Sequence, residues 1–525
     1  MFKLISKKLR FLKKMLESQV STKQQSSATE LASRLDLNIG KVKEKLGDSS
    51  DVIIRRFMIN GIRMEYAAII FIEGLADKTI INDNILQPLM NAENQNFKNR
   101  IDLDFVAENL LTVGGVQRVN TVEELIEAVL TGDTAIILEH SDTALFVNTK
   151  GWEKRSITEP DTEIVIKGPR EGFTETLRIN TSLVRRRIEH PALRFETMKI
   201  GKKTRTDICI AYLEGLTNPK LVAEVKRRLG RINIDGILAS GFIEQFIEDA
   251  PYSPFMTVGY TERPDVCTAK LLEGRVAIFV DGTPVVNTVP YLMYEGFQSP
   301  DDYNFRPFFA TSVRWFRYLA FFVSILLPAV YVALASYHQE LIPTPLLISM
   351  AAATEGTPFS ALIEALGMGM VFELLREAGI RLPRPIGQAV SIVGALVIGE
   401  ATVSAGLVGA PIVIVVAFTA ISSFLVPVQV EAGLMLRVGL TILAGFLGAY
   451  GIIGGLIFVY IHLASLRSFG TPYLAPLAPL IPADFKDTIV SVPIWAMFKR
   501  PRNLGIQDPI RQKFKLMPQP EEQDE

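Results

Sequence analysis

The pattern of apolar and polar positions divides the chain into two parts of different kinds. From about residue 51 to residue 313, short apolar runs alternate with amphipathic stretches, which predicts strands alternating with helices. The run YAAIIFIEGL (66–75) is typical of a buried strand, and ADKTIINDNILQPL after it predicts a turn that leads into a helix. From residue 318 to residue 465 the apolar runs are longer, as in membrane-spanning helices.

Two phrases of the first part occur twice, which predicts a duplication. The tripeptide Glu-Gly-Leu at 73–75 returns at 214–216. The phrase at 127–140 returns at 269–282, with nearly the same spacing between the copies, and each copy has a helix end, a Gly turn and a strand. The sequence therefore predicts two related α/β subdomains, with chance similarity between β-rich phrases as the alternative.

The soluble part offers few residues for chemistry. It has no phosphate-binding P-loop and no GxSxG nucleophile motif. Gly168-Pro169-Arg170 follows an expected strand, EIVIK, and this turn could hold an anion, although a structural turn is favoured. Glu73 and Glu214 precede glycines at strand ends, where capping a loop is favoured over catalysis. We therefore expect that the chain is not an enzyme and needs no cofactor.

Composition and charge exclude further functions. Lys plus Arg (55) nearly equal Asp plus Glu (56), so no global charge indicates a nucleic acid partner. Cys209 and Cys267 are too few for a disulfide framework or a four-cysteine zinc site, and the four histidines are scattered. The segment 318–465 holds 11 charged residues in 148 positions, with neither Lys nor Asp among them. This distribution excludes a purely soluble protein and indicates a polytopic membrane domain.

Five apolar segments predict membrane crossings, at 318–336, 346–376, 386–405, 411–427 and 440–463. Arg314 and Arg317 precede the first, which places the N-terminal side in the cytosol, and basic residues near the C-terminus place that end there too. Two ends on one side require an even number of crossings, so either one segment is re-entrant or a hairpin, or the C-terminal end does not lie in the cytosol. The glycines of 440–463 would permit a hairpin, but close packing is favoured there; Glu431 and Arg437 are expected to mark a turn.

The segment 346–379 differs from an ordinary lipid-facing helix. Glu-Gly-Thr-Pro at 355–358 must break a helix, which predicts either a broken helix that lines a cavity or a re-entrant segment. Carboxylates in apolar surroundings need water, a cation or a partner. The candidate ion pathway consists of Glu355, Glu364, Ser349, Ala352, Thr354 and Pro358. Glu373 and Glu377 are expected instead to pair with Arg376 and Arg381.

Two further patterns concern packing and lipid. Gly387, Ser391, Ala395 and Gly399 recur at every fourth position, a stripe that lets a neighbouring helix approach closely. The opening stretch MFKLISKKLRFLKKML is strongly basic and has no long apolar run, so it is not a secretory signal. It predicts either an interfacial helix on anionic lipid or a disordered basic tail.

The predicted fold class is a soluble α/β N-terminal region of two related subdomains plus an α-helical polytopic membrane domain. The parts are a basic, flexible tail at 1–50, α/β subdomains at 51–190 and 191–313, a transmembrane domain of about five membrane segments at 314–465, and a C-terminal tail at 466–525. The boundary between the subdomains falls near the basic run at 185–187.

Four long motifs resemble the A-subunit family of spore germinant receptors, the GerA family. They are FELLREAGIRLPRPIGQAVSIVGALVIGEATVSAGLV (372–408), KGPREGFTETLRINTSLVRRRI (167–188), VDGTPVVNTVPYLMYEGFQSPDDY (280–303) and SLRSFGTPYLAPLAPL (465–480). The resemblance spans about 50–495. Its candidate structural signature includes Arg376, Arg381, Arg384, Gly168, Pro169 and Arg170.

The resemblance implies a multi-pass protein of the spore inner membrane with a cytosolic N-terminal region. It implies that the chain acts with a permease-like B subunit and a lipoprotein C subunit, and that nutrient binding triggers the release of monovalent cations. It also implies a homo-oligomer that forms a ligand-gated ion channel. A non-conducting membrane scaffold or a transporter-like signalling subunit is the alternative.

Overall fold

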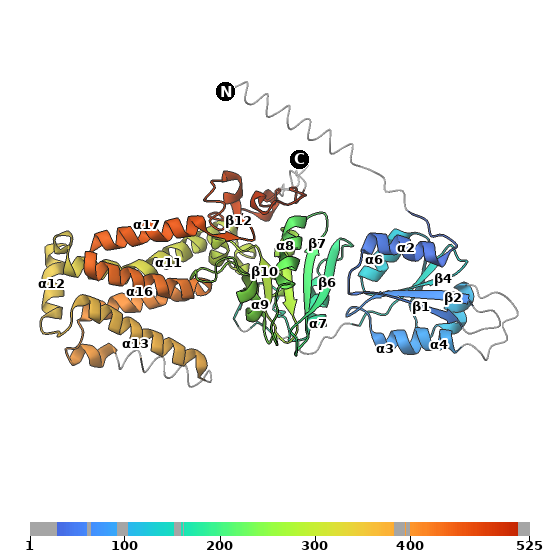
Figure 1. Cartoon of the computed structure of the whole chain (residues 1–525), viewed down its shortest axis with the longest axis horizontal. Helices are drawn as coiled ribbons and strands as arrows, with labels where there is room; N and C mark the ends of the chain where they lie inside the picture. Colours follow the sequence, from blue (N-terminus) through green and yellow to red (C-terminus); the bar gives the residue numbers. More distant parts are fainter. Residues whose placement is uncertain are drawn as a thin grey trace, which may run out of the picture. The chain divides into compact units, whose positions relative to one another are not determined.

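The computed structural model describes residues 29–59, 65–91, 103–151, 159–160, 162–382, 394 and 399–512. The chain divides into two compact units, the first formed by Met1–Arg155 and Thr181–Glu196 and the second by Ser156–Asn180 and Thr197–Glu525 (Figure 1). Residues 1–28 of the tail predicted at 1–50 lie outside the described residues. The flexible tail is wrong for the rest, because Leu35–Leu46 form a helix whose apolar side chains are buried in the core of the first unit.

The first unit is built on an antiparallel sheet. Its strands are β1 (Val52–Ile59), β2 (Glu65–Ile72), β3 (Val116–Val119), β4 (Thr134–Leu138) and β5 (Ala144–Val147), in the order β1-β2-β4-β5-β3. Helices α2 (Leu35–Leu46) and α6 (Val122–Leu130) cover one face, while α3 (Lys78–Ile80) and α4 (Gln87–Met90), joined by a π-helical stretch, Ile81–Leu86, cover the other (Figure 1). Two short helical pieces, α5 (Leu103–Phe105) and the π-helical Val106–Leu110, complete that second layer.

The two helical layers explain why β2 is apolar at nearly every position. Ile69 and Phe71 pack with Ile85 and Leu89 on one side of the sheet. Ile70, on the opposite face of the same strand, packs with the residues of α2 and α6. Successive strand residues point to opposite faces, so a strand covered on both sides has no position for a polar residue. The buried strand predicted at 66–75 is confirmed.

A second sheet, most of which belongs to the second unit, has the same strand order. Its strands are β6 (Leu193–Ile200), β7 (Thr206–Leu213), β8 (Gly259–Thr261), β9 (Val276–Val280) and β10 (Val286–Val289), in the order β6-β7-β9-β10-β8. The helices of this region are α7 (Leu177–Arg185), α8 (Pro219–Leu229), α9 (Ser240–Ile247) and α10 (Pro264–Leu272). The identical order agrees with the duplication that the repeated phrases predict.

Equivalent turns of the two copies share an unusual backbone conformation. Gly132 and Gly274, between helix and strand, have φ values of 99° and 84°. After that strand His140 has a φ of 65°, and Gly282, its counterpart in the second copy of the phrase, has 85°. Glycine adopts positive φ most readily, which explains why both copies keep a glycine at 132 and 274; at the second position only one copy has glycine, and His140 adopts the same left-handed region.

The strand predicted at EIVIK (163–167) is wrong. This segment has no regular structure, and its backbone donors bond side chains: the N–H groups of Ile166 and Lys167 donate to the Asp301 carboxylate at 3.3 and 3.1 Å. Val165 is buried, but Ile164 and Ile166 are 68% and 80% exposed. The alternation of apolar and polar residues in EIVIK therefore does not mark a strand. The segment is a loop that buries the single side chain of Val165.

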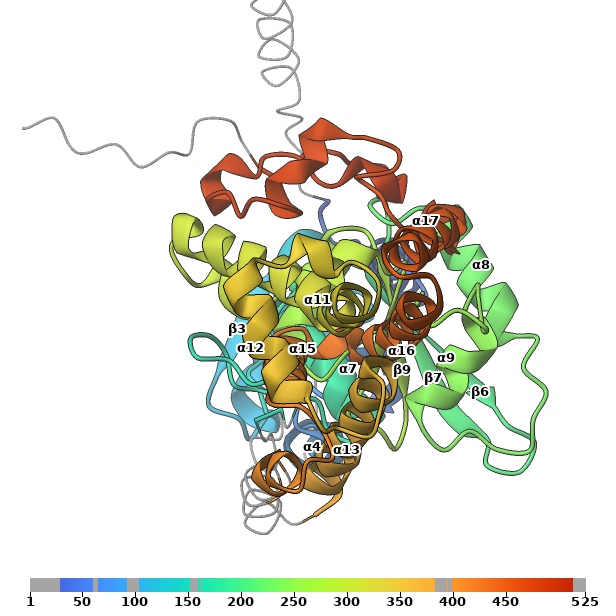
Figure 2. The ribbon, with the colours of Figure 1, turned by 90° about the vertical axis from the view of Figure 1, so that its left-hand side faces the viewer.

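The C-terminal half of the second unit is a bundle of apolar helices, seen end-on in Figure 2. They are α11 (Pro307–Ser336), α12 (Thr344–Thr354), α13 (Ala361–Arg381), α15 (Ala410–Phe424), α16 (Val430–Leu447) and α17 (Ala449–Ser465). Among the described residues two segments, Pro307–Ser336 and Pro427–Leu447, are long and apolar enough to cross a membrane. Helix α11 has 30 residues, or about 45 Å, which exceeds the ~30 Å hydrocarbon core of a bilayer.

Of the two alternatives for 440–463, the structure shows the hairpin, and the favoured single span is wrong, because the chain turns within it. Helix α16 ends and α17 begins at Gly448, whose φ of 57° and ψ of −139° no helix can contain. The two helices pack against each other as a hairpin, with Gly455 of α17 close to Leu440 of α16. The expected turn at Glu431 and Arg437 is also wrong, since both lie inside α16.

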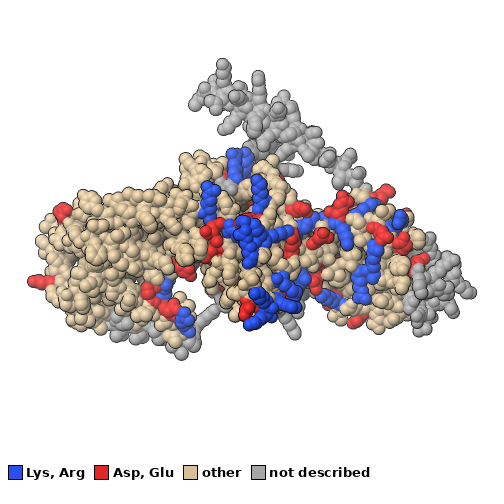
Figure 3. Space-filling view, in the orientation of Figure 1, with Lys and Arg blue, Asp and Glu red and all other residues tan. Residues whose placement is uncertain are grey.

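Figure 3 shows where the charged side chains lie. They cover the α/β elements and the C-terminal segment, while the bundle surface is almost free of them. Large apolar side chains such as Phe418, Phe446 and Phe458 are exposed on this surface. A soluble domain rarely exposes so continuous an apolar surface, which indicates that lipid or another chain covers it.

The predicted C-terminal tail is folded as far as residue 512. It has a two-stranded ribbon, β11 (Arg467–Ser468) and β12 (Thr471–Pro472), and three 3₁₀ turns, at Pro482–Asp487, Ile494–Ala496 and Arg502–Leu504. Its end docks on the second α/β subdomain, where the Gln507 N–H donates to the Leu216 carbonyl at 3.1 Å.

Candidate functional site

The break predicted at 355–358 separates α12 from α13. Helix α12 ends at Thr354, and Gly356 has a φ of 105°, which a helix cannot include. The N–H and hydroxyl of Thr357 both donate to the Thr354 carbonyl, at 3.1 and 3.0 Å, so the freed end of α12 is closed by a local turn. Glu355 and Pro358 lie in this connection.

Helix α12 has no buried residue within the chain. Of the predicted pathway residues, Ser349, Ala352, Glu355 and Pro358 are exposed or half-buried, and Thr354 is half-buried with its hydroxyl bonded to the Met350 carbonyl. Their role in ion passage stays a prediction. An apolar helix without a single buried position still shows that further molecules must cover this part of the bundle.

Glu364, the remaining predicted pathway residue, is placed differently. Its side chain is buried in the first turn of α13, with 3% of its surface exposed. The Gly409 N–H, at the start of α15, lies 3.5 Å from one carboxylate oxygen, and the other oxygen has no hydrogen-bond partner among the described residues. Glu364 therefore lies inside the packing of α13 against α15, whereas Glu355 lies outside it.

Three charged residues meet inside the bundle. Glu373 pairs with Arg376 at 2.6 Å, one helical turn away, as predicted, and Arg381 pairs with Glu377. The sequence did not predict that Arg437 of α16 also bonds Glu373. This second arginine joins α13 to α16, so the cluster holds two helices together as well as neutralising a carboxylate.

One residue of the predicted structural signature and most of the small-residue stripe lie outside the described residues. This applies to Arg384 and to Gly387, Ser391 and Ala395 of the small-residue stripe. Gly399, the last member of the stripe, is described, and a side chain there would meet Val413 of α15 at 3.7 Å, an ordinary contact.

The turn at Gly168-Pro169-Arg170 has structural partners. Arg263, fully buried, donates to the Pro169 carbonyl at 2.7 Å and to the Glu163 carbonyl at 3.2 Å. Arg170 itself is exposed and lies 3.8 Å from Glu159. The Arg263 contacts support the favoured interpretation of this motif as a structural turn.

A buried charge cluster anchors the first long apolar helix at its base. Arg314 of α11 pairs with Asp302 at 3.1 Å and with Asp487 at 3.3 Å, and Arg317 pairs with the same Asp302 at 2.9 Å. In the sequence, Arg314 serves to assign the side of the membrane. In the structure Arg314 also links the 3₁₀ helix Pro300–Tyr303, which holds Asp302, to the C-terminal segment. Burial raises the pKa of Asp487 to about 6, against the opposing effects of Arg314 and Tyr303.

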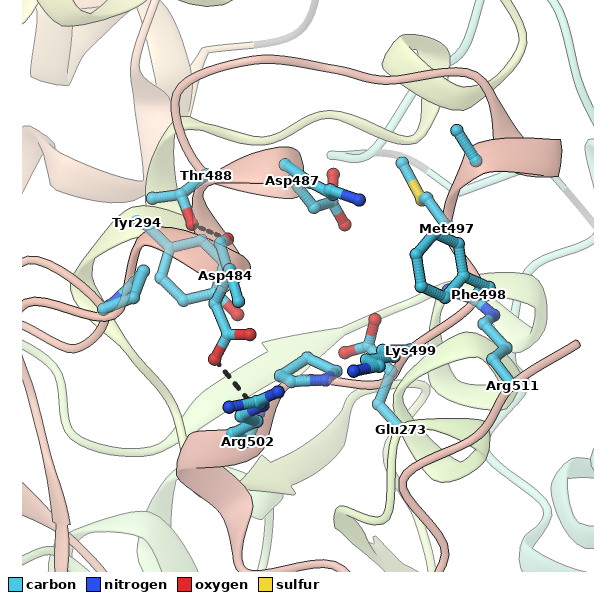
Figure 4. Close-up of a pocket in the computed structure, with 15 residues that line it drawn as sticks. Glu273, Tyr294, Asp484, Asp487, Thr488, Met497, Phe498, Lys499, Arg502 and Arg511 are labelled. Atoms are coloured by element: carbon cyan, nitrogen blue, oxygen red, sulfur yellow. Dashed lines mark hydrogen bonds between the residues drawn. The ribbon is translucent and has the colours of Figure 1, made fainter. Parts of the chain in front are cut away.

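A cavity of about 170 Å³ lies beside this cluster (Figure 4). Its walls come from the turn after α10 (Glu273), from Tyr294 and from the C-terminal segment between 476 and 511. Lys486, Lys499, Arg502 and Arg511 line it together with the acidic Asp484 and Asp487. The wall at Asp487 and Thr488 is the same stretch that bonds Arg314.

Comparison with known proteins identifies the family. Residues 40–503 match the model of the family described as Bacillus/Clostridium GerA spore germination protein. The chain belongs to this GerA family. "Spore germination protein KA" of Bacillus subtilis (strain 168) is 46% identical over 92% of this chain and 89% of its own length. "Spore germination protein GerLA" of Bacillus cereus is 40% identical over 89% of this chain and 95% of its own length.

One solved structure is also similar, the N-terminal domain of the A subunit of the Bacillus megaterium spore germinant receptor GerK3. It is 38% identical, the match covers 51% of this chain and 98% of that one, and the TM-score is 0.41. The resemblance stated from the motifs is confirmed by the family match and the relatives. This GerA-family protein is an A subunit of a spore germinant receptor with a role in spore germination, and its two long apolar helices indicate association with a membrane.

Sequence reasoning missed several polar contacts of this GerA-family protein. Asp302, Arg437 and Asp487 each bond a residue that the sequence did single out, Arg314 or Glu373. A weak signal existed for Asp302, which follows Pro300 and Asp301 directly before the first apolar segment. No signal existed for Asp487, because it lies 173 residues from Arg314 along the chain.

Proposed function

We propose that this GerA-family A subunit forms, as a homo-oligomer, a nutrient-gated channel for monovalent cations in the spore inner membrane. Opening of the channel would release ions and start germination. The proposal includes a permease-like B subunit and a lipoprotein C subunit as partners, several crossings of the membrane and a cytosolic N-terminal region. It assigns the chain no catalytic step.

The observation that carries the proposal is the exposure of α12 (Thr344–Thr354). This helix is apolar, has no buried residue and leads directly into the break at Glu355. About five membrane segments are too few to enclose a path easily in one chain, whereas a ring of copies would place one exposed segment from each around an axis. A ring of carboxylates at such a break favours cations.

The two candidate carboxylates then take different roles. Glu355 is exposed beside Gly356 and Pro358, and it supplies the acidic ring in this proposal. Glu364 is buried against the start of α15, and in this proposal it holds the first turn of α13, directly after the break, in place. Ser349 and Ala352, on the exposed α12, would leave room for water along the path.

The test is cation flux through the purified full-length protein, with its partner subunits, in liposomes. Ala352→Phe should block nutrient-triggered flux without preventing assembly, because a phenyl group would fill a narrow bore. Ala417→Phe is the matched control, since Ala417 is an exposed alanine of α15 away from the break. Glu355→Gln should change the preference among cations more than it changes assembly.

The outcomes separate a channel from a scaffold. If bulky substitutions throughout 349–360 leave the flux of assembled receptor unchanged, this segment does not line the path. If the wild-type receptor carries no flux at all, the non-conducting scaffold becomes the better account, with α12 as a docking helix.

A further inference from the structure

The cavity at the C-terminal segment is closed by parts of the chain that are far apart in sequence. Glu273 and Tyr294 come from the second α/β subdomain and the segment that follows it, and the remaining walls come from residues 476–511 (Figure 4). Its volume of about 170 Å³ is well above the roughly 10–15 Å³ that one water molecule needs. It is smaller than the ~300–1,000 Å³ of pockets for drug-sized ligands, so a ligand here would be small.

The acidic residues of the cavity already have partners. Asp487 pairs with Arg314 at 3.3 Å and accepts from the Tyr303 hydroxyl at 2.9 Å. Asp484 accepts the backbone N–H of Arg502 at 3.0 Å, as Figure 4 shows. Glu273 lies 3.5 Å from the Arg275 guanidinium.

The basic residues of the cavity are not neutralised in the same way. The side chains of Lys499, Arg502 and Arg511 are exposed and form no ion pair with any carboxylate of the part of the chain that the structure describes. Lys486 lies over the Phe498 ring at 4.6 Å and forms no ion pair with a described carboxylate either. Within the described residues, four cations without an ion-pair partner therefore line a space whose acidic groups each have a partner.

We propose that this cavity binds a small oxyanion of the phosphate or carboxylate class. Lys499, Arg502 and Arg511 would supply the charge-assisted hydrogen bonds, because guanidinium and ammonium groups bind such oxygens more strongly than neutral donors do. The apolar wall at Met497 and Phe498 would accept a short hydrocarbon part of an organic anion. Free anions and the phosphate of a lipid headgroup share this chemistry.

The site is connected to the first membrane helix. The same C-terminal stretch that forms its wall makes several hydrogen bonds to α11. Arg314 donates to the Asp487 carbonyl at 2.6 Å, the Trp315 indole donates to the Ile489 carbonyl at 3.0 Å, and the Ser491 N–H donates to the Thr311 hydroxyl at 3.1 Å. An anion that draws Lys499 and Arg502 inwards would therefore stabilise the contact of this segment with α11.

The experiment uses the full-length protein in nanodiscs of neutral phosphatidylcholine. Inorganic phosphate is titrated against chloride at constant ionic strength, and thermal unfolding and the fluorescence of Trp315 and Trp495 are followed. We expect a saturable rise in Tm with phosphate. Removal of two charged donors in Lys499→Gln/Arg502→Gln should weaken the apparent affinity by roughly tenfold or more. Lys220→Gln, an exposed lysine on α8, is the control and should leave the affinity unchanged.

A second arm distinguishes the source of the anion. In phosphate-free buffer, anionic phosphatidylglycerol replaces phosphatidylcholine in the nanodisc. A rise in Tm that disappears in the double variant assigns the site to a lipid headgroup, and a rise with inorganic phosphate alone assigns it to a free anion. The proposal is overturned if neither addition has a saturable effect on the wild type, or if the double variant responds as the wild type does.

Discussion

Arg314 and Asp302 form an ion pair from which solvent is excluded. Their side chains are 0% and 1% exposed, and their nearest atoms, Nη2 and Oδ2, are 3.1 Å apart. Arg317 bonds the same carboxylate, so one aspartate holds two arginines near the start of α11. A buried charge of this kind depends on its partners, because the loss of one partner leaves the other charge in an apolar environment.

Replacement of Arg314 by methionine should therefore destabilise the protein strongly. The expected loss is about 3–5 kcal/mol in the free energy of unfolding, since Asp302 and Asp487 each lose a buried partner. Thermal unfolding of the purified protein in detergent measures it. Arg306→Met is the control, because Arg306 is exposed immediately before α11. Equal Tm values for the two variants would contradict this account.

Asp487 should make stability depend on pH. Burial and the nearby Glu273 raise its pKa to about 6 from 3.8. The folded state then binds more protons than the unfolded state between about pH 4 and 6, so this group lowers the free energy of unfolding as the pH rises through that range. Asp487→Asn should remove a contribution of about 3 kcal/mol from the pH profile. The measurement is Tm against pH, and Asp508→Asn, at an exposed position of the same segment, should keep the wild-type slope.

Much of the fold could be predicted because the deciding information is local. The strand β2 is apolar from Ala67 to Ile72 since both of its faces are covered there, and the repeated glycines at 132 and 274 occupy positions of positive φ. The break after α12 follows from Gly356 and Pro358 in the same way. Each of these features depends on a few neighbouring residues whose backbone preferences are strong.

What could not be predicted depends on distant partners. Arg437 bonds Glu373 across 64 residues, and no local pattern connects them. The segment EIVIK has the alternation of a strand, but its N–H groups bond Asp301, which lies far away along the chain. The turn at Gly448 lies among several glycines, and the sequence does not show which of them, if any, leaves the helix.

The hairpin can be tested at Gly448. With its φ of 57° and ψ of −139°, an alanine there would be strained, and its Cβ would lie 3.0 Å from the His338 ring and from Tyr337. Gly448→Ala should cost roughly 1–3 kcal/mol of stability. Gly454→Ala is the matched control, because Gly454 lies within α17 with no atom within 4 Å of the new Cβ. It should be neutral or slightly stabilising. In a single continuous helix through 440–463 both substitutions would be neutral or stabilising, so equal effects of the two would contradict the hairpin.

The proposed orientation can be tested by cysteine labelling. Tyr252 is fully exposed in the second α/β subdomain, and Leu341 is exposed in the connection between α11 and α12, at the other end of α11. Both native cysteines, Cys209 and Cys267, are buried and give little background. In intact membranes an impermeant maleimide should label Leu341→Cys and leave Tyr252→Cys unlabelled. The opposite pattern would place the α/β region outside.

The separate roles of Glu355 and Glu364 lead to the sharpest comparison within the bundle. Glu355→Gln removes a charge at an exposed position and should change the permeability ratio of two monovalent cations. Glu364→Gln keeps an acceptor oxygen for the Gly409 N–H and should leave that ratio unchanged. Glu364→Leu removes the acceptor and leaves a buried N–H without a partner, which should lower the stability by about 1–3 kcal/mol. Flux assays and thermal unfolding on the same preparations separate the two effects. If Glu364→Gln changes the permeability ratio as much as Glu355→Gln does, Glu364 reaches the ion path and its burial in a single chain does not describe the open state.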